Sequence, residues 1–167
     1  MSKIWILSRP IRSGKTTEIL NTLPYLGKVD GILCPDKEDL RYAYSIAEQQ
    51  YLPLQVNESH APSDSIQIGR FYFLKEGFLS AQQILLDTLN KSLDWVIVDE
   101  IGKLEYQRNE GLEPALSVFI NHHLKSSEAT HILLVIRDFL LEDIIAHYQL
   151  QEAHIVHDLK QWRPQNP

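Results

Sequence analysis

The sequence predicts an α/β domain in which helices flank a mainly parallel sheet, with an antiparallel insertion in the middle of the chain. Three observations support this prediction. Short apolar runs typical of buried strands alternate with amphipathic segments typical of helices. The middle of the chain, about residues 38–75, breaks that alternation. The 167 residues suffice for one domain with a hydrophobic core and are too few for two ordinary ones, so we treat residues 1–167 as one unit.

The N-terminal part of the chain has the order strand, helix, strand. Residues 3–8 (KIWILS) form a nearly continuous apolar run, as expected of a strand buried on both faces. A helix is expected over residues 14–23, ending near Pro24. The segment VDGILC, residues 29–34, predicts the second strand.

The middle of the chain favours partly exposed antiparallel strands. Residues 41–47 and 52–55 alternate between apolar and polar side chains, whereas residues 56–65 are polar and without a period. The segment IQIGRFYF, residues 66–73, is interpreted as one further strand that contains Gly69.

The C-terminal part returns to alternating helices and strands. Residues 78–89 carry apolar side chains at helical spacing, and so do residues 112–124, where Pro114 suits a first helical turn. A helix over residues 140–148 is expected to have Asp138 as its N-cap. The remaining strands are expected over residues 95–98, 131–136 and 154–156.

Composition excludes several classes of protein. The net charge is −6 and there is no run of Lys or Arg, so we do not expect nucleic acid as a partner. The first apolar run spans four residues, and no stretch approaches the roughly 18 apolar residues of a membrane span. Cys34 is the single cysteine and has no partner for an internal disulfide. We therefore expect a cytoplasmic protein without a membrane segment.

A Gly-Lys-Thr triplet, residues 14–16, follows the first predicted strand and opens the first predicted helix, which is the context of a phosphate-binding loop. Gly14 allows close approach of the backbone, Lys15 can reach the β and γ phosphates, and Thr16 can bind Mg²⁺. The residues expected to bind the phosphates are Arg12, Ser13, Gly14, Lys15, Thr16 and Thr17. The pattern departs from the usual loop at Arg9, which replaces its first glycine and is followed by Pro10. We expect a working loop with a stiffer entrance.

A second half-motif, WVIVDE, ends a predicted buried strand at residues 95–100. Ligands of open α/β sheets bind at the carboxyl ends of the strands, where these two carboxylates should lie. We expect Asp99 to support Mg²⁺, through water, and Glu100 to orient or deprotonate a water beside the γ-phosphate. The candidate catalytic residues are thus Lys15, Asp99 and Glu100, and the candidate metal ligands are Thr16 and Asp99.

The string VDEIGKLE, residues 98–105, together with SGKTT, resembles the family of small P-loop nucleoside-triphosphatases, which includes the thermophilic and cancer-related types. The resemblance covers most of the chain, through segments such as DGILCP, RYAYSIA and LLVIRD. It implies a RecA-like P-loop fold and Mg²⁺-dependent hydrolysis of ATP, GTP and other nucleoside triphosphates to diphosphate and phosphate. Gly14, Lys15, Thr16, Asp99 and Glu100 match the family directly. The chain departs from it at Arg9 and has a shorter, less glycine-rich middle, which suggests a divergent branch.

Two alternative functions share this loop: a small-molecule or nucleotide kinase, and a nucleotide-binding switch with little turnover. The sequence has no arginine-rich lid segment of the kind a kinase uses. A charge donor in cis could come from Arg137, Arg108 or Lys103, although Arg137 could equally pair with Asp138.

Other reactive side chains have structural interpretations. The seven histidines show no metal-binding spacing, and adjacent His122 and His123 on a helix should point apart. Cys34 is interpreted as a small residue at a strand end. Alternating aromatic residues could form a stacking platform for a base, but sheet packing explains them more simply; they are Tyr42, Tyr44, Phe71 and Phe73.

Overall fold

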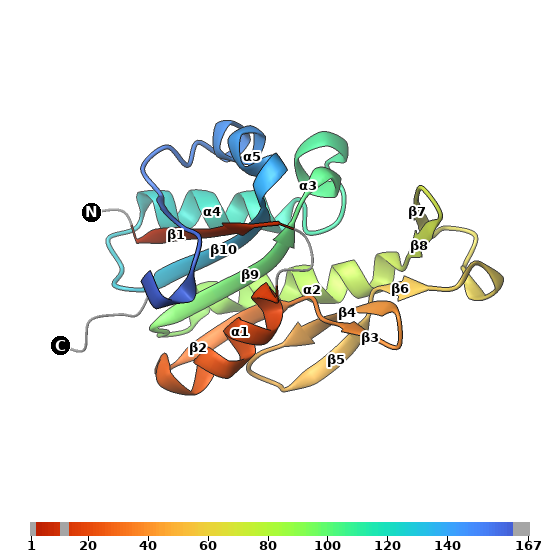
Figure 1. Ribbon diagram of the computed structural model, residues 1–167, viewed down its shortest axis with the longest axis horizontal. Helices are drawn as coiled ribbons and strands as arrows, with labels where there is room; N and C mark the ends of the chain where they lie inside the picture. Colours follow the sequence, from red (N-terminus) through yellow and green to blue (C-terminus); the bar gives the residue numbers. More distant parts are fainter. Residues whose placement is uncertain (1–2, 11–13, 162–167) are drawn as a thin grey trace.

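A computed structural model describes residues 3–10 and 14–161 of the chain. Its described part contains an eight-stranded sheet in the order β11-β1-β10-β9-β2-β4-β3, with β5 paired to β4 (Figure 1). The strands of this sheet are β1 (Ile4–Arg9), β2 (Val29–Leu33), β3 (Asp36–Lys37), β4 (Leu40–Ser45), β5 (Gln50–Pro53), β9 (Trp95–Ile101), β10 (His131–Arg137) and β11 (His154–Val156). The five strands from β11 to β2 pair in parallel, and the pairs made by β4 are antiparallel. The predicted mixed architecture is confirmed.

Helices cover both faces of the sheet. The α-helices are α1 (Lys15–Thr22), α2 (Lys75–Asp87), α3 (Lys103–Arg108), α4 (Ala115–Lys125) and α5 (Leu141–Tyr148). The 3-10 turns are η1 (Leu23–Tyr25), η2 (Glu58–His60), η3 (Thr88–Asn90), η4 (Asp138–Leu140) and η5 (Leu159–Gln161). Buried side chains of α2, α4 and α5 join one hydrophobic cluster, whereas Ile19 of α1 joins a second cluster with Leu26 and Leu159. The two clusters lie on opposite faces of the sheet.

The central strands contribute to both clusters, which explains their continuous apolar sequences. In β9, Val96 and Val98 lie in the first cluster, while Trp95 and Ile97 lie in the second. Successive side chains of a strand point to opposite faces, so a strand between two layers of helices must be apolar at every position.

The segment over residues 66–73 is not one strand, as the sequence analysis expected. It forms a hairpin of β7 (Ile66–Ile68) and β8 (Phe71–Phe73), because Gly69 turns the chain at a φ of 57°. With β6 (Gln55–Val56), this hairpin builds a small antiparallel sheet that projects beside α2 (Figure 1). Tyr42 and Tyr44 lie in the main sheet, so the four alternating aromatic residues do not share one strand or one sheet.

Three local expectations also need correction. Helix α3 and the turn η2 lie in segments without a predicted element. Pro114 is the N-cap of α4, one position before the helix begins. Asp138 does not cap α5; its carboxylate accepts a hydrogen bond of 2.9 Å from Phe139 N, because the turn η4 precedes the helix.

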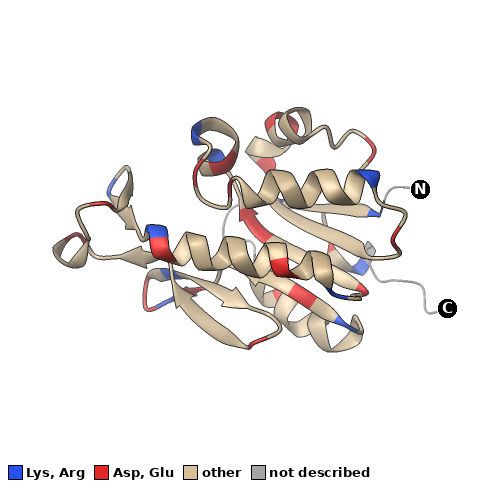
Figure 2. Cartoon of the chain, turned by 180° about the vertical axis from the view of Figure 1, so that it is seen from behind, with Lys and Arg blue, Asp and Glu red and all other residues tan. Residues whose placement is uncertain are grey.

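The charged side chains are dispersed. Figure 2 shows Lys and Arg residues interspersed with Asp and Glu residues rather than gathered on one element. Across residues 3–10 and 14–161, every helix is too short or too polar to cross a bilayer.

Candidate functional site

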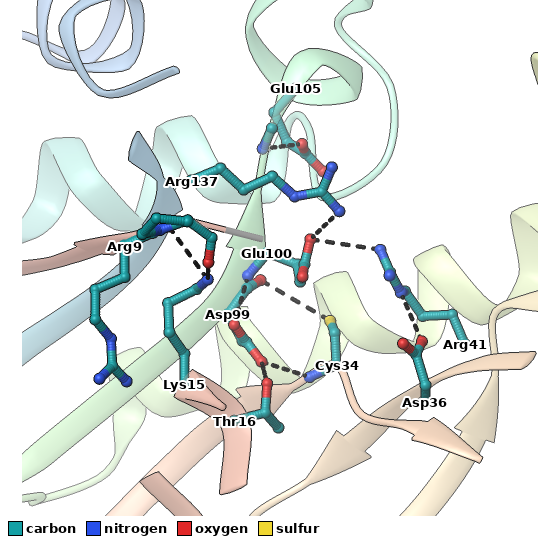
Figure 3. A network of polar contacts seen from close by, with 12 residues as sticks. Arg9, Lys15, Thr16, Cys34, Asp36, Arg41, Asp99, Glu100, Glu105 and Arg137 are labelled. Atoms are coloured by element: carbon teal, nitrogen blue, oxygen red, sulfur yellow. Dashed lines mark hydrogen bonds and ion pairs between the residues drawn. The ribbon is translucent and has the colours of Figure 1, made fainter. Parts of the chain in front are cut away.

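The carboxyl ends of β1, β9 and β10 meet at one edge of the sheet, and α1 begins there. Figure 3 shows the polar network at this edge, to which these elements and the antiparallel strand β4 all contribute. Since β10 pairs in parallel with both β1 and β9, residues 9, 99–100 and 137 reach the same edge although they are far apart in sequence.

Thr16 and Asp99 are in direct contact. Oγ1 of Thr16 donates a hydrogen bond of 2.9 Å to Oδ2 of Asp99. The Asp99 side chain is only 1% exposed and also accepts hydrogen bonds from the backbone N–H of Cys34 and of Glu100. Burial, with the neighbouring charge of Glu100, raises the pKa of Asp99 to about 6, although the three hydrogen bonds oppose this shift. A cation beside Asp99 would supply the missing countercharge.

Lys15 lies at the first turn of α1 and is buried. Its ammonium group donates hydrogen bonds to the carbonyl oxygens of Pro10, at 2.8 Å, and Arg9, at 3.3 Å. Burial lowers the pKa of Lys15, and the charges of Glu100 and Asp99 partly offset this effect. Because this ammonium group is already largely removed from water, its movement from the carbonyl oxygens to a nearby anion would cost little further desolvation free energy.

The amino end of α1 has the features of an anion site. Gly14, at its N-cap, has a φ of 81°, a left-handed conformation that glycine adopts without strain. Among the described residues, no side-chain hydrogen bond caps this helix end. Its N–H groups and the helix dipole therefore favour a phosphate there. Thr17 lies exposed in the same turn, whereas Arg12 and Ser13 fall outside the described residues.

Arg9, the departure from the usual loop, contacts the site through its carbonyl oxygen, but its side chain does not enter it. It is the last residue of β1, with extended backbone, so the position does not require a glycine. Its guanidinium donates two hydrogen bonds to Glu18 of α1, at 3.0 and 2.7 Å. Figure 3 shows this side chain directed away from Asp99 and Glu100.

Glu100 has an unusual backbone. Its φ is 57°, and the register between β9 and β10 shifts at this point: Val98 pairs with Leu134, but Ile101 pairs with Ile136. One extra residue in β9 is a β-bulge, which redirects a side chain and is common beside functional sites. Without the bulge, the alternation of the strand would place residues 99 and 100 on opposite faces.

Two arginines bind the carboxylate of Glu100. Oε2 accepts hydrogen bonds from Nη2 of Arg137, at 3.2 Å, and from Nη1 of Arg41, at 3.4 Å (Figure 3). The sequence analysis weighed Arg137 for this edge and missed Arg41, which lies in β4 of the insertion and also pairs with Asp36. Arg41 follows no motif, and only the antiparallel pairing of β4 with β2 brings it here.

The other candidates divide between this site and other parts of the fold. Arg137 pairs with Glu100 rather than with Asp138. Arg108 donates to the carbonyl of Gln67 and pairs with Glu110, and the Lys103 ammonium lies over the ring of Phe139. Cys34 serves as a backbone donor to Asp99, and burial raises the pKa of its thiol well above the ordinary value.

Glu105, the last residue of the VDEIGKLE string, stabilises the fold next to the site. Glu105 is buried, and its two carboxylate oxygens accept hydrogen bonds from the N–H groups of Gly102, at 2.9 Å, and Leu112, at 3.1 Å. It thereby connects the chain after Glu100 to the loop that leads into α4.

A strand, loop and helix with Gly-Lys-Thr at the helix start, facing an acidic pair on a parallel strand of the same sheet, define the P-loop NTPase fold. The sequence profile of the family described as NTPase matches residues 4–161, and the chain belongs to this family.

A solved structure has the same fold. The crystal structure of THEP1 from the hyperthermophile Aquifex aeolicus is similar with a TM-score of 0.71 and 15% sequence identity, over 92% of this chain and 88% of that one. A search of curated proteins finds no significant match.

Proposed function

We propose that this chain hydrolyses nucleoside triphosphates, ATP and GTP among them, to diphosphate and phosphate with the help of Mg²⁺. The observation that carries the proposal is the hydrogen bond of 2.9 Å between Thr16 and Asp99. It joins the hydroxyl that a P-loop offers to Mg²⁺ with the carboxylate that supports this ion from the neighbouring strand. Family membership agrees with this chemistry.

The residues at the site fit a magnesium ion. Mg²⁺ prefers oxygen ligands and keeps several of its waters, so a hydroxyl and one carboxylate are a sufficient protein contribution. Asp99 is buried beside a second carboxylate, and burial together with the charge of Glu100 raises its pKa to about 6. A cation bound there would offset both effects. Bound with the nucleotide, the ion would neutralise charge on the β and γ phosphates.

The protein's own groups would hold the triphosphate. The Lys15 ammonium would leave the carbonyls of Arg9 and Pro10 for the phosphate oxygens, and the amino end of α1 would bind them through N–H groups. Arg41 and Arg137 would exchange part of their contact with Glu100 for the γ-phosphate. Released from this pairing, Glu100 would orient the attacking water and accept its proton.

Residues 1–167 act as one catalytic domain in this proposal. Strands from β1 near the amino end to β11 near the carboxyl end share one sheet, and the insertion supplies Arg41 to the site.

A second candidate function follows from the pairing of Glu100 itself. In this structure, two arginines hold the carboxylate that should activate water. A protein in which this pairing persists after nucleotide binding would retain the intact triphosphate, as a switch does, until a partner releases Glu100.

One assay separates these functions and the kinase alternative. The purified protein is incubated with Mg²⁺ and each triphosphate, without an acceptor, and both free phosphate and protein-bound nucleotide are measured. Hydrolysis predicts phosphate release that falls strongly in Lys15→Ala and Glu100→Gln but not in Lys28→Ala, an exposed lysine that follows η1. Equal release by the wild type, Lys15→Ala and Glu100→Gln would refute the proposal. Retained intact nucleotide would favour the switch, and release only after an acceptor pool is added would favour a kinase.

A further inference from the structure

The carboxyl end of α4 brings together two histidines and a glutamate that have no role in the site above. His122 and His123 lie in the last turn of α4, and Glu128 lies in the loop that leads to β10. One possible ligand atom from each of the three residues lies within 4.8 Å of the others. The sequence analysis expected the two adjacent histidines to point apart, but their ring centroids are 5.1 Å apart.

Both imidazoles have a ring nitrogen without a hydrogen-bond partner. Nε2 of His122 and Nε2 of His123 are shielded from solvent and form no hydrogen bond within the described residues. The Glu128 carboxylate approaches the first of them, with Oε2 at 3.5 Å from Nε2 of His122, an ion-pair distance at which the two atoms form no hydrogen bond. Buried polar atoms are rarely left without a partner, and a bound ion is one explanation for such atoms.

Charged groups of both signs lie around the cluster. Glu128 adds a negative charge, and the carboxyl end of a helix favours cations. The opposing charge comes from Lys3, whose ammonium donates a hydrogen bond of 3.1 Å to the carbonyl of Ser127.

We propose that His122, His123 and Glu128 bind a zinc-class transition-metal dication at a site separate from the triphosphate site. Two imidazoles and one carboxylate suit Zn²⁺, which takes nitrogen and oxygen ligands at about 2.0–2.2 Å, and do not suit Mg²⁺. Tetrahedral ligand atoms then lie about 3.4 Å apart. The contact of 3.5 Å between His122 and Glu128 already matches this spacing. Rotation of the exposed Glu128 side chain and of the His123 imidazole would shorten the remaining distances between ligand atoms to this value. A water molecule would take the fourth position.

The bound metal would connect the end of α4 to the loop before β10. Glu128 lies beyond the end of the helix at Lys125, so the ion would hold the loop of residues 126–130 against the last helical turn. Figure 1 shows this end of α4 beside the start of β1, where Lys3 contacts Ser127. The expected effect is on the stability of the fold.

Metal titration tests the proposal. Zn²⁺ binding by calorimetry, and the visible absorption of bound Co²⁺, should detect the site in the wild type, and Zn²⁺ should raise the melting temperature. His122→Gln, His123→Gln and Glu128→Gln should each weaken binding roughly tenfold or more and abolish the increase in melting temperature. His60→Gln, which changes an exposed histidine of η2, is the control and should bind as the wild type does.

The triphosphate site could also bind these metals, and Thr16→Val distinguishes the two. Binding that persists in Thr16→Val and is lost in the histidine variants supports the proposal, whatever the outcome for hydrolysis. Absence of Zn²⁺ binding, or binding that the three substitutions leave unchanged, would overturn it. Circular dichroism of each variant establishes that the fold is intact.

Discussion

Thr16 at the start of α1 donates a hydrogen bond of 2.9 Å to Asp99 at the end of β9, 83 residues later in the chain. These residues come from two separate half-motifs, and the contact brings them to one point at the edge of the sheet. The buried Asp99 is otherwise bound by backbone N–H groups only, so Thr16 provides its one side-chain hydrogen bond among the described residues.

Thr16→Val should lower phosphate release roughly 100-fold and raise the Mg²⁺ concentration needed for half-maximal rate, because it removes a proposed metal ligand without changing side-chain volume. Thr22→Val is the matched control, because it removes a hydroxyl of the same helix that donates to the carbonyl of Glu18. Rates measured against Mg²⁺ concentration check both. An unchanged Mg²⁺ requirement in Thr16→Val would contradict the metal assignment.

Glu100→Gln should lower the turnover number about 100- to 1,000-fold while nucleotide affinity changes little, because the amide cannot take the proton from water. Single-turnover phosphate release and equilibrium binding of nucleotide separate the two effects. The exposed Glu142→Gln on α5 is the control. A loss of affinity that accounted for the whole effect would mean that Glu100 holds nucleotide rather than activates water.

Arg9→Gly restores the usual first glycine of the loop but should not increase the rate by more than a few-fold, because the Arg9 side chain lies outside the site. It should lower stability through loss of the pair with Glu18, which is worth only about 0.5–1 kcal/mol since Glu18 is 43% exposed. Denaturant unfolding of Arg9→Gly, Glu18→Gln and the double variant measures this coupling. Additive effects of the two substitutions would show that the ion pair contributes nothing.

Gly31→Ala should unfold or strongly destabilise the protein, by more than about 3 kcal/mol. Gly31 has a φ of 124°, and an added Cβ would lie 2.0 Å from the carbonyl oxygen of Ile97, its partner in the pairing of β2 with β9. Gly69→Ala is the control: its φ is also positive, at 57°, but nothing lies within 4 Å of the added Cβ. It should cost about 1–2 kcal/mol of strain. In thermal unfolding, the melting temperature of Gly31→Ala should therefore be much lower than that of Gly69→Ala.

The contribution of Glu105 to stability should fall as pH rises from about 4.5 to 7, because burial raises the pKa of this carboxyl group from 4.5 to about 7. Within this window the folded state binds more protons than the unfolded state, so the free energy of unfolding decreases with pH and this contribution is constant above the window. The effect is up to about 3 kcal/mol. Denaturant unfolding at several pH values gives the free energy of unfolding as a function of pH. This free energy should change less with pH in Glu105→Gln than in the wild type, and as much as in the wild type in the exposed Glu152→Gln.

Much of the fold followed from local patterns. Strands β1, β9 and β10 were predicted because continuous apolar runs mark strands buried on both faces, and α1 because it follows a loop motif. The hairpin of β7 and β8 was misread as one strand, since Gly69 within an apolar run is compatible with either structure. Helix α3 was missed because its six residues, KLEYQR, are too few to show a periodic apolar face.

The sequence by itself determined the α/β architecture, the family and the two half-motifs, since each depends on residues close together in the chain. Tertiary structure alone decided which groups meet around them. The bulge that turns Glu100 toward Arg41 and Arg137 and the pairing of Arg9 with Glu18 join separate elements or depend on strand register. Such contacts result from how sheets and helices pack in three dimensions, and no periodicity along the chain encodes them.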